Sequence, residues 1–534
     1  MTPQVTYSHP WLTVSYAWPI VAVVRELPDA RWNERDKTWR VLATPLAAAL
    51  LRDAGAELSH EALWLCGEYD RSQEPQPVEI DWGTSPWPHQ ARGAEWLAGR
   101  YAGMLAYGMG AGKSLTTIGA ISGWGAKRVL ILCPRSVIGV WRREFARHYP
   151  GAIDMVCLDD DRPTKSKAAR YWRHRASYDL ACQDSLHVCV INYESAWREP
   201  LGKTLVGHEW DVLVLDESHR VKSPTGKAAK YCAQLALRAR RRVCLTGTPM
   251  PHSPLDIWSQ MRVVEPAVLG TSFARFRAKY AVCHPVYPSK ILRWKEQDEL
   301  ARKIEPWVLR VKTEDVVSLP GITHSVVGFQ LAPKAQQIYE SMEKEMFARL
   351  DDGEEVSAAN VLVKLLRLQQ ITSGRIDEHT IGSEKSDTLL DLLGDVPAEE
   401  PVVVFARFRE DLAELKKIAE KLGRTYGEIS GTRRDLTEHA TMPEGIGLMA
   451  VQQQSGGVGI DLTGASIGVW YSLGFSLGDY DQAIARLYRP GQPKPVAMYH
   501  LVAEKTVDEV VYDALAMRRD VVEVVLSQLQ EKVQ

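Results

Sequence analysis

The stretch that decides the fold of this 534-residue chain reads Tyr107-Gly-Met-Gly-Ala-Gly-Lys-Ser114. Its glycines permit turns that other residues avoid and let the backbone approach a ligand closely. A helix predicted at 113 to about 122 would point its first amides at phosphates. Lys113 would neutralise the β- and γ-phosphates, and the Ser114 hydroxyl would bind Mg²⁺. The stretch predicts a phosphate cradle formed by Gly108, Gly110, Ala111, Gly112, Lys113, Ser114 and Leu115.

Two carboxylates in Asp216-Glu-Ser-His219 supply the second half of this chemistry. They follow an apolar run at 212–215, so we expect them at the carboxyl edge of a buried strand, where open α/β sheets bind ligands. Asp216 would hold the metal ion, and Glu217 would orient and deprotonate an attacking water. His219 is a candidate for sensing the state of the phosphates. The sequence therefore predicts hydrolysis of ATP with Mg²⁺ as cofactor.

The composition is that of an ordinary globular protein, with 45% hydrophobic residues, 25% charged residues and a net charge of −2. This total neither indicates nor excludes nucleic acid, because binding requires only a local basic face. The eight cysteines include no CxxC pair, which argues against a zinc site and against a disulfide framework. Without a signal pattern or an apolar run near the ~20 residues of a membrane span, we expect a soluble, intracellular protein.

Short apolar runs alternate with amphipathic segments along most of the chain, which is typical of parallel sheets covered by helices. We therefore expect an α/β fold with two domains in series, at 87–320 and 321–534. A small α+β module at 1–66 and a linker at 67–86 would precede them. Charged and aromatic residues indicate a helical insertion at about 271–310. The predicted buried strands are 129–133, 188–191, 212–215, 242–245, 402–405, 446–450 and 467–471.

The N-terminal module has its own local signals. Apolar residues predict strands at 20–27 and 37–42, and the polar residues at 33–36 are typical of a hairpin turn. A short helix is predicted at 45–54, because Thr44 suits its N-cap, Pro45 suits its first position and Gly55 follows its end.

Several segments together resemble the Swi/Snf-like DNA translocases of helicase superfamily two, from about 88 to 514. The resemblance implies two tandem RecA-like domains that bind ATP and act on double-stranded DNA. Trp87-Pro-His-Gln90 is similar to the family's adenine-reading segment, which implies that Gln90 contacts the base. One departure lies in the phosphate cradle, where Tyr107 replaces the first glycine of the general pattern.

Other segments of the first domain resemble the family's DNA-facing parts. Cys133-Pro-Arg-Ser-Val137, followed by Trp141, is similar to the segment that grips the DNA backbone. Thr246-Gly-Thr-Pro249 is similar to the segment that couples hydrolysis to movement. The resemblance implies coupling roles for His219 and Thr248. It implies nucleic-acid contacts from Pro134, Arg135, Ser136, Trp141, Thr246 and Gly247.

The second domain carries the family's arginine motif, Gln482-Ala-Ile-Ala-Arg-Leu-Tyr-Arg489-Pro-Gly-Gln492. The resemblance implies that Arg486 and Arg489 reach the nucleotide held by the first domain, with Gln482 beside them. A glycine-rich segment before this motif implies DNA contacts from Ser455, Gly456 and Gly457. It also implies a nucleotide contact from Asp461, which stands where the family usually has asparagine.

Arg31-Trp-Asn-Glu-Arg-Asp-Lys-Thr-Trp39 resembles the HARP domain of annealing helicases, which implies engagement of branched DNA. That role requires a shared accessible face for Arg25, Arg31, Arg35, Lys37 and Arg40. The alternative is that Trp32 and Trp39 are simply core residues.

The predicted function is ATP-driven translocation on double-stranded DNA, with annealing, fork regression or branch migration as the work performed. Two alternatives stay open: removal of proteins from nucleic acid, and an ATP-gated DNA-binding switch that does not move. Protein partners are not predicted.

Overall fold

The computed structural model describes residues 2–74, 77–158, 165–172, 185–251, 253–285, 291–316, 318–351, 358–376, 379–438, 440–453 and 460–517. The chain divides into two compact units, unit 1 (Met1–Val316) and unit 2 (Val317–Gln534), close to the boundary expected at 320/321. Among the described residues, no helix combines the length and apolar character that crossing a bilayer requires.

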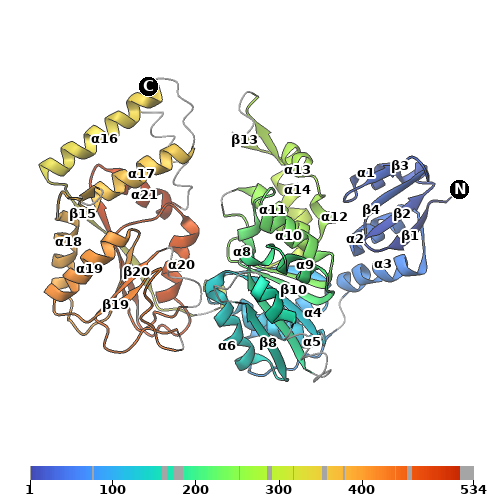
Figure 1. Cartoon of the computed structure of the whole chain (residues 1–534), viewed down its shortest axis with the longest axis horizontal. Helices are drawn as coiled ribbons and strands as arrows, with labels where there is room; N and C mark the ends of the chain where they lie inside the picture. Colours follow the sequence, from blue (N-terminus) through green and yellow to red (C-terminus); the bar gives the residue numbers. More distant parts are fainter. Residues whose placement is uncertain are drawn as a thin grey trace. The chain divides into compact units, whose positions relative to one another are not determined.

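Unit 1 begins with a five-stranded sheet in the order β3-β4-β2-β1-β5, drawn in blue in Figure 1. The turn predicted at 33–36 is confirmed and the strand predicted at 37–42 is β4, but the other arm of the hairpin is β3, which was not predicted; Asn33 pairs with Thr38. The predicted helix is confirmed as α2, because Thr44 Oγ1 accepts the Ala47 amide at 3.0 Å. The bounds are β1 Gln4–Ser8, β2 Trp11–Ser15, α1 Val21–Glu26, β3 Arg31–Asn33, β4 Thr38–Leu42, α2 Pro45–Asp53, β5 Glu57–Leu58 and α3 His60–Gln73.

Two local predictions for this module are wrong. The strand expected at 20–27 is largely the helix α1, because its buried residues Ile20, Val24 and Leu27 are spaced by four and three, which is a helical period. The linker expected from 67 is helical as far as Gln73, where α3 ends.

The module packs against the rest of unit 1. Glu68 on α3 forms an ion pair with Arg241 at 2.6 Å. A second contact is the hydrogen bond that Thr271 Oγ1 donates to Asp29 Oδ1 at 3.0 Å. The module and the following sheet therefore form one compact body.

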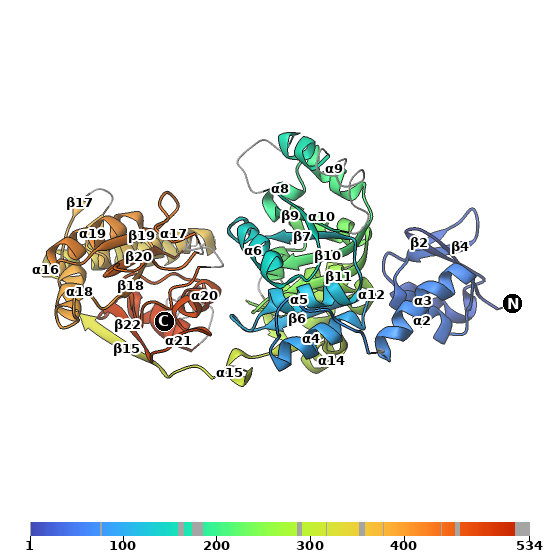
Figure 2. The same cartoon turned by 90° about the horizontal axis from the view of Figure 1, so that it is seen from below.

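The main sheet of unit 1 has seven parallel strands in the order β14-β6-β11-β10-β7-β9-β8. The four strands predicted in this region are confirmed as β7, β9, β10 and β11. Helices α4, α5 and α6 lie on one face and α8, α9 and α10 on the other (Figure 2). The bounds are α4 Pro88–Ala98, β6 Ala102–Tyr107, α5 Lys113–Gly123, β7 Arg128–Cys133, α6 Ile138–His148, β8 Ile153–Leu158, β9 Leu186–Asn192, α8 Tyr193–Ala196, α9 Leu201–Val206, β10 Trp210–Asp216, α10 Lys227–Ala236, β11 Ala239–Leu245 and β14 Val308–Val311.

The insertion expected at about 271–310 is mainly helical but also contains a small antiparallel hairpin. Its last strand, β14, returns to the edge of the main sheet beside β6. The segments between β11 and β14 are α11 Ile257–Val264, α12 Pro266–Leu269, α13 Phe273–Tyr280, β12 Ala281–Cys283, β13 Ile291–Trp294 and α14 Gln297–Ile304.

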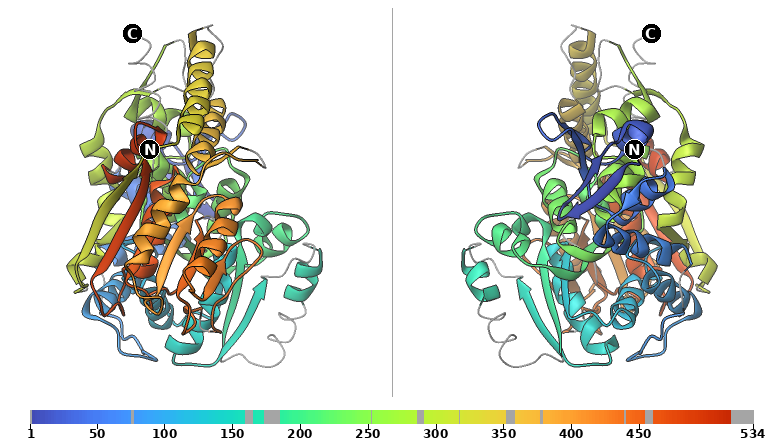
Figure 3. Two further views of the ribbon diagram at one scale, coloured as in Figure 1. Left: turned by 90° about the vertical axis from the view of Figure 1, so that its left-hand side faces the viewer. Right: turned by 90° about the vertical axis from the view of Figure 1, so that its right-hand side faces the viewer.

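Unit 2 contains a second parallel sheet, with the strand order β15-β22-β21-β18-β20-β19. Helices α18 and α19 cover one face and α20 lies on the other, as Figures 2 and 3 show. The two helix-covered parallel sheets confirm the predicted fold class. The bounds are β15 Ile322–Phe329, α16 Pro333–Asp351, α17 Ala358–Thr372, α18 Glu384–Gly394, β18 Val402–Ala406, α19 Arg409–Lys421, β19 Tyr426–Ile429, β20 Leu448–Gln452, β21 Ile467–Trp470, α20 Leu477–Leu487, β22 Val496–Ala503 and α21 Val507–Ala516.

Candidate nucleotide-binding site

The phosphate cradle connects β6 to α5 in unit 1. Gly110 and Gly112 adopt φ values of 76° and 82°, which lie in the region that favours glycine. A Cβ added to Gly112 would lie 2.1 Å from Gln90 Nε2, so the loop and α4 leave no room for a side chain there. The cradle is thus a bare backbone turn that ends at a helix N-terminus, as an anion site requires.

Lys113 is bound to the loop that it follows. Its Nζ donates to the carbonyl oxygens of Tyr107 at 3.0 Å and of Gly108 at 3.3 Å. The ammonium group is therefore held in the turn, next to the first residues of α5. Ser114 is the second residue of this helix, where its hydroxyl is a fitting oxygen ligand for Mg²⁺.

Gln90 lies against the cradle. Its Oε1 accepts the Trp87 amide at 2.8 Å, and its Nε2 donates to the Ala111 carbonyl at 3.4 Å. His89 contacts the same carbonyl through Nε2 at 2.8 Å. The segment expected to read adenine is thereby fixed to the loop expected to bind phosphates.

Tyr107, which replaces the first glycine of the general pattern, is fully buried at the end of β6. Its hydroxyl donates to the His89 carbonyl at 3.3 Å. Gly93 on α4 makes room for this ring, because a Cβ at position 93 would lie 2.0 Å from Tyr107 Oη and 2.9 Å from Thr116 Cγ2. The tyrosine therefore fills the space between α4 and β6.

Asp216 and Glu217 lie where β10 ends, and both are almost completely buried. Asp216 accepts hydrogen bonds from Trp141 Nε1 and from the Glu217 amide, both at 2.9 Å. Burial and then the charge of Glu217 raise the pKa of Asp216 well above its ordinary value, while the ammonium of Lys113 opposes the rise. Burial also raises the pKa of Glu217, again against Lys113. A divalent cation at these oxygens would offset the cost of two neighbouring buried charges.

A chain of polar contacts leaves this carboxylate pair. His219 Nδ1 lies 3.3 Å from Glu217 Oε2 and 3.1 Å from Thr246 Oγ1. The same Thr246 oxygen accepts the Thr248 amide at 3.1 Å. The carboxylate pair is thus connected to the segment at 246–249, which the sequence singled out for coupling.

Three of the predicted DNA-contacting residues lie in the interior. Trp141 is 1% exposed and its indole is bonded to Asp216, so the expectation that it grips DNA is corrected to one that it positions the carboxylate. Thr246 is fully buried and its hydroxyl contacts His219, and Pro134 is also buried. Arg135 is exposed, and Ser136 and Gly247 are half-buried, so these three stay candidates for a phosphate contact.

The arginine motif lies on α20 and just after it, in unit 2. Arg486 is 6% exposed, and burial lowers its pKa to about 10, an effect that Asp479 opposes. Arg489 Nη1 donates to the Ile460 carbonyl at 3.3 Å. Within the described part of the chain, Arg486 Nη1 and Arg489 Nε have no hydrogen-bond partner. Both guanidinium groups therefore have donors left for an anion.

The other predicted residues of unit 2 have mixed outcomes. Gln482 lies on α20, half-buried, between Asp479 and Arg486. Asp461 Oδ1 accepts the amide and the hydroxyl of Thr463 at 2.9 and 2.7 Å, so this carboxylate caps its own turn. Ser455, Gly456 and Gly457 lie outside the described residues.

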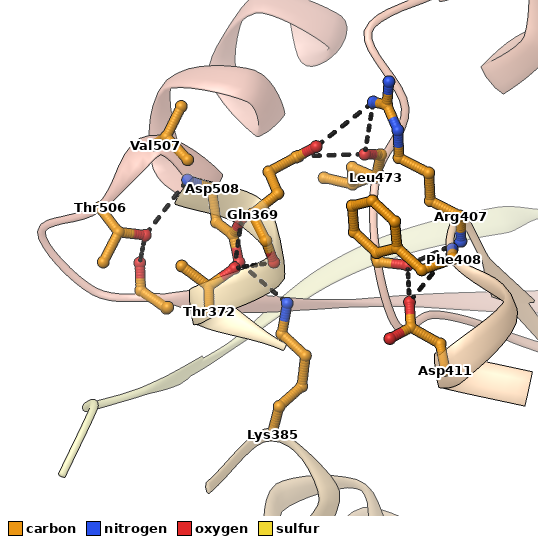
Figure 4. Close-up of polar contacts among 12 residues, drawn as sticks. Gln369, Thr372, Lys385, Arg407, Phe408, Asp411, Leu473, Thr506, Val507 and Asp508 are labelled. Carbon is orange, nitrogen blue, oxygen red and sulfur yellow. Dashed lines mark hydrogen bonds and ion pairs between the residues drawn. The ribbon is translucent and has the colours of Figure 1, made fainter. Parts of the chain in front are cut away.

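Arg407 was not singled out from the sequence, yet it holds the loop that leads into α20 (Figure 4). Its Nη1 donates to Gln369 Oε1 at 3.3 Å and to the Leu473 carbonyl at 3.5 Å. Its guanidinium lies 4.1 Å from the ring centroid of Phe475. The carboxylate of Asp479 raises the pKa of both Arg407 and Arg486, against the effect of burial. The one available signal was its place after β18, because the carboxyl ends of parallel strands carry binding sites.

Fold and site together define an ATPase of helicase superfamily two, with tandem RecA-like domains. The SNF2-related domain profile matches residues 89–375, more than half of the chain, and the helicase conserved C-terminal domain profile matches 384–491. The chain therefore belongs to the SNF2-related family.

Curated relatives are similar over most of this chain. Chromodomain-helicase-DNA-binding protein 1-like is 25% identical in Danio rerio, over 83% of this chain and 44% of the relative. In Mus musculus it is 27% identical, with 85% and 52% covered. DNA repair and recombination protein RDH54 of Saccharomyces cerevisiae is 26% identical, with 73% and 44% covered. The chain spans about half the length of the curated relatives it matches.

Among solved structures, the SWI2/SNF2 ATPase core of Sulfolobus solfataricus in complex with dsDNA is 23% identical. The match covers 83% of this chain and 92% of that one, with a TM-score of 0.40.

Gly93→Ala should destabilise unit 1, because the new methyl group collides with Tyr107 and overpacking costs ~1–3 kcal/mol. We expect a lower midpoint of thermal unfolding and weaker ATP binding. Adding Tyr107→Phe, which removes the closest atom, should restore part of both. Gly67→Ala on α3 is the control, since its Cβ would be in ordinary contact at 3.6 Å from Arg71 Nη1. Equal stability of the Gly93 and Gly67 variants would contradict the proposed packing of Tyr107.

Asp411→Asn should change how stability depends on pH. Burial raises the pKa of Asp411 to about 6, while Oδ2 alone accepts both Ser472 Oγ at 2.6 Å and the Phe408 amide at 3.4 Å. Since the ordinary Asp pKa is ~3.9, the unfolded chain loses the proton first, and the free energy of unfolding falls as pH rises from ~4 to ~6. Asparagine keeps both bonds without this loss.

The measurement is urea unfolding of wild type and variant at pH 5 and pH 7.5. We expect the Asp411→Asn advantage to grow towards pH 7.5, to ~1–3 kcal/mol. Asp391→Asn, on the exposed side of α18, serves as the control. A wild-type-to-variant difference that is equal at both pH values would show that Asp411 stays ionised throughout.

Proposed function

We propose that this chain is an ATP-dependent translocase on double-stranded DNA that remodels branched DNA by annealing, fork regression or branch migration. The single observation that carries the proposal is the buried pair Asp216 and Glu217, which feels the charge of Lys113 and is connected through His219 to the segment at 246–249. Membership of the SNF2-related family supports ATP hydrolysis. The names of the relatives, which include DNA binding, repair and recombination, support DNA as the partner.

Each group at the site has a role in this mechanism. Loop amides and Lys113 bind the phosphates, and Gln90 orients the base. Mg²⁺, held by Ser114 and Asp216, would neutralise charge on the phosphate oxygens. Glu217 orients the attacking water and accepts its proton, which its raised pKa favours. Arg486 and Arg489 then stabilise the transition state, and an arginine finger contributes ~10³–10⁵ in rate.

His219 gives this cycle a route to movement. Its ring contacts Glu217 on one side and Thr246 on the other, so a change of charge at Glu217 alters both contacts. The segment at 246–249 also presents the half-buried Gly247, and Arg135 is exposed on the same unit. We infer that these residues hold the DNA backbone, so binding should be salt-sensitive and weakly sequence-specific.

The N-terminal module offers a second surface for phosphates. Arg31 and Arg40 are direct cross-strand partners, so both side chains lie on the same face of the sheet, opposite to buried Val41 and Leu12. Two like charges in this register repel each other, and an anion would relieve the repulsion. This exposed pair supports binding of a DNA arm by the module.

The other aromatic and basic residues of the module do not all lie on the face that carries Arg31 and Arg40. Trp39 packs against the core, whereas Trp32 is 47% exposed and lies 5.6 Å from the Trp39 ring. Arg25 is stacked over Trp39 at 5.9 Å, on the helix-covered side of the sheet. The five basic residues are all exposed, but they do not share one face.

Two alternatives make different demands on experiment. An ATP-gated binding switch would hydrolyse ATP with DNA but would not displace the third strand of a triplex. A remover of proteins would need a bound protein for its full turnover. We favour translocation, because the polar chain from Glu217 to Thr248 joins the carboxylate pair to the coupling segment.

Lys113→Ala should abolish ATP hydrolysis, because no other cation of unit 1 is bonded to the cradle carbonyls among the described residues. The measurement is steady-state ATPase with single-stranded, duplex and forked DNA and with duplex RNA, together with triplex displacement. We expect the wild-type chain to be stimulated by duplex and forked DNA and to displace the third strand. Lys230→Ala, on the exposed side of α10, is the control. DNA-stimulated turnover by Lys113→Ala would refute the site.

Arg31→Ala combined with Arg40→Ala should weaken binding of forked DNA and leave hydrolysis without DNA unchanged. Loss of two phosphate contacts should lower the salt slope of log K by about 2. Fluorescence anisotropy across a salt series measures the slope, with Lys416→Ala combined with Lys421→Ala as a control of equal charge. An unchanged slope would mean that the module is a stabilising cap and does not contact DNA.

A further inference from the structure

Thr313 contacts the phosphate cradle from the far end of unit 1. It is the first residue of α15 (Thr313–Val316), the last element before unit 2 begins. Its hydroxyl donates to the Met109 carbonyl at 2.7 Å. Neither the sequence patterns nor the mechanism above uses this residue.

The backbone before Thr313 follows the same loop. Strand β14 pairs with β6 as far as Val311 and Tyr107, and the Gly108 amide donates to the Val311 carbonyl at 2.8 Å. The contact is also close. A Cβ at Gly108 would lie 2.3 Å from Thr313 Oγ1 and 2.9 Å from its amide nitrogen. The end of unit 1 and the start of the cradle therefore touch over several successive residues.

Three successive carbonyls at the start of the cradle are bound by two side chains. Lys113 takes those of Tyr107 and Gly108, and Thr313 takes that of Met109. In a planar trans peptide the carbonyl and the next amide point in opposite directions. By holding the Met109 oxygen, Thr313 fixes the direction of the Gly110 amide, one of the donors expected to face phosphate.

The two restraints differ in what happens when phosphates bind. Lys113 must turn from the loop carbonyls to the phosphate oxygens, which releases Tyr107 and Gly108. The bond from Thr313 is not consumed in this exchange, because its hydroxyl has no role at the phosphates. The Met109 carbonyl at the start of the cradle is therefore still held after Lys113 has turned, as the Ala111 carbonyl is by His89 and Gln90.

We propose that Thr313 is a positioning residue that orients the phosphate loop for ATP, and that the segment joining the two units adjusts ATP affinity through it. This inference rests on the proposed function of the cradle. Any rearrangement that pulls on α15 acts on the Met109 peptide through one hydrogen bond. A signal from DNA that alters the joint would reach the nucleotide by this route.

The test compares Thr313→Val, which keeps the shape but loses the hydroxyl, with Thr313→Ser, which keeps the hydroxyl. Affinity for a fluorescent ATP analogue with Mg²⁺ is measured by titration, and KM and kcat by ATPase assay. One hydrogen bond is worth about 3- to 10-fold in binding. We expect the valine variant to raise Kd and KM by that factor with a smaller change in kcat, and the serine variant to stay within about twofold.

Thermal unfolding separates positioning from folding. The midpoint should be the same in wild type and in both variants. Wild-type affinity in the valine variant, or an equal loss in the serine variant, overturns the positioning role. A loss of affinity that merely follows a lower unfolding midpoint overturns it as well.

A second measurement tests transmission from the joint. The analogue is titrated with and without duplex DNA, and the ratio of the two Kd values is compared among variants. We expect a ratio different from one in the wild type, kept in the serine variant and moved towards one in the valine variant. A ratio of one in the wild type, or an unchanged ratio in the valine variant, overturns transmission.

Lys113→Ala distinguishes this inference from the proposed function. Hydrolysis by Lys113→Ala would remove the cradle assignment and with it the role of Thr313. If Lys113→Ala is inactive while Thr313→Val behaves like wild type, the cradle stands and only the role of Thr313 fails.

Discussion

The rest of this protein depends on one constraint, the burial of two neighbouring carboxylates, Asp216 and Glu217, beside the single ammonium group of Lys113. Burial raises the pKa of Asp216 and Glu217, and Lys113 offsets only part of this cost. The indole of Trp141 and the amide of Glu217 also stabilise the Asp216 carboxylate by hydrogen bonds, which is why Trp141 lies in the core. A cation that binds beside such a pair stabilises its charges. When the cation leaves, the polar contacts of His219 with Glu217 and Thr246 should change.

The features that were predictable from sequence are those written in local patterns. Strands β7, β9 and β10 follow from short apolar runs, and the cradle follows from its glycines and from Lys113. The N-cap of α2 follows from Thr44 in front of a proline. In each case a few neighbouring residues determine the backbone, so the pattern and the structure agree.

The remaining features depend on partners far apart in the chain. Trp141 was assigned to DNA because of its neighbours, yet its position is set by Asp216, 75 residues away. The role of Arg407 could not be predicted, because its partners in the loop at 472–476 are far from it in the sequence. The helix α1 was mistaken for a strand because a short apolar run has no length to reveal its period. Contacts of this kind become visible only in three dimensions.

Tyr107 packs so closely on Gly93 that position 93 cannot carry a side chain while the ring is present. A tyrosine at the end of β6 requires the smallest residue on the facing helix. Moving this cradle, with its tyrosine, into another protein of the family would therefore also require a facing helix that carries glycine at the position of Gly93.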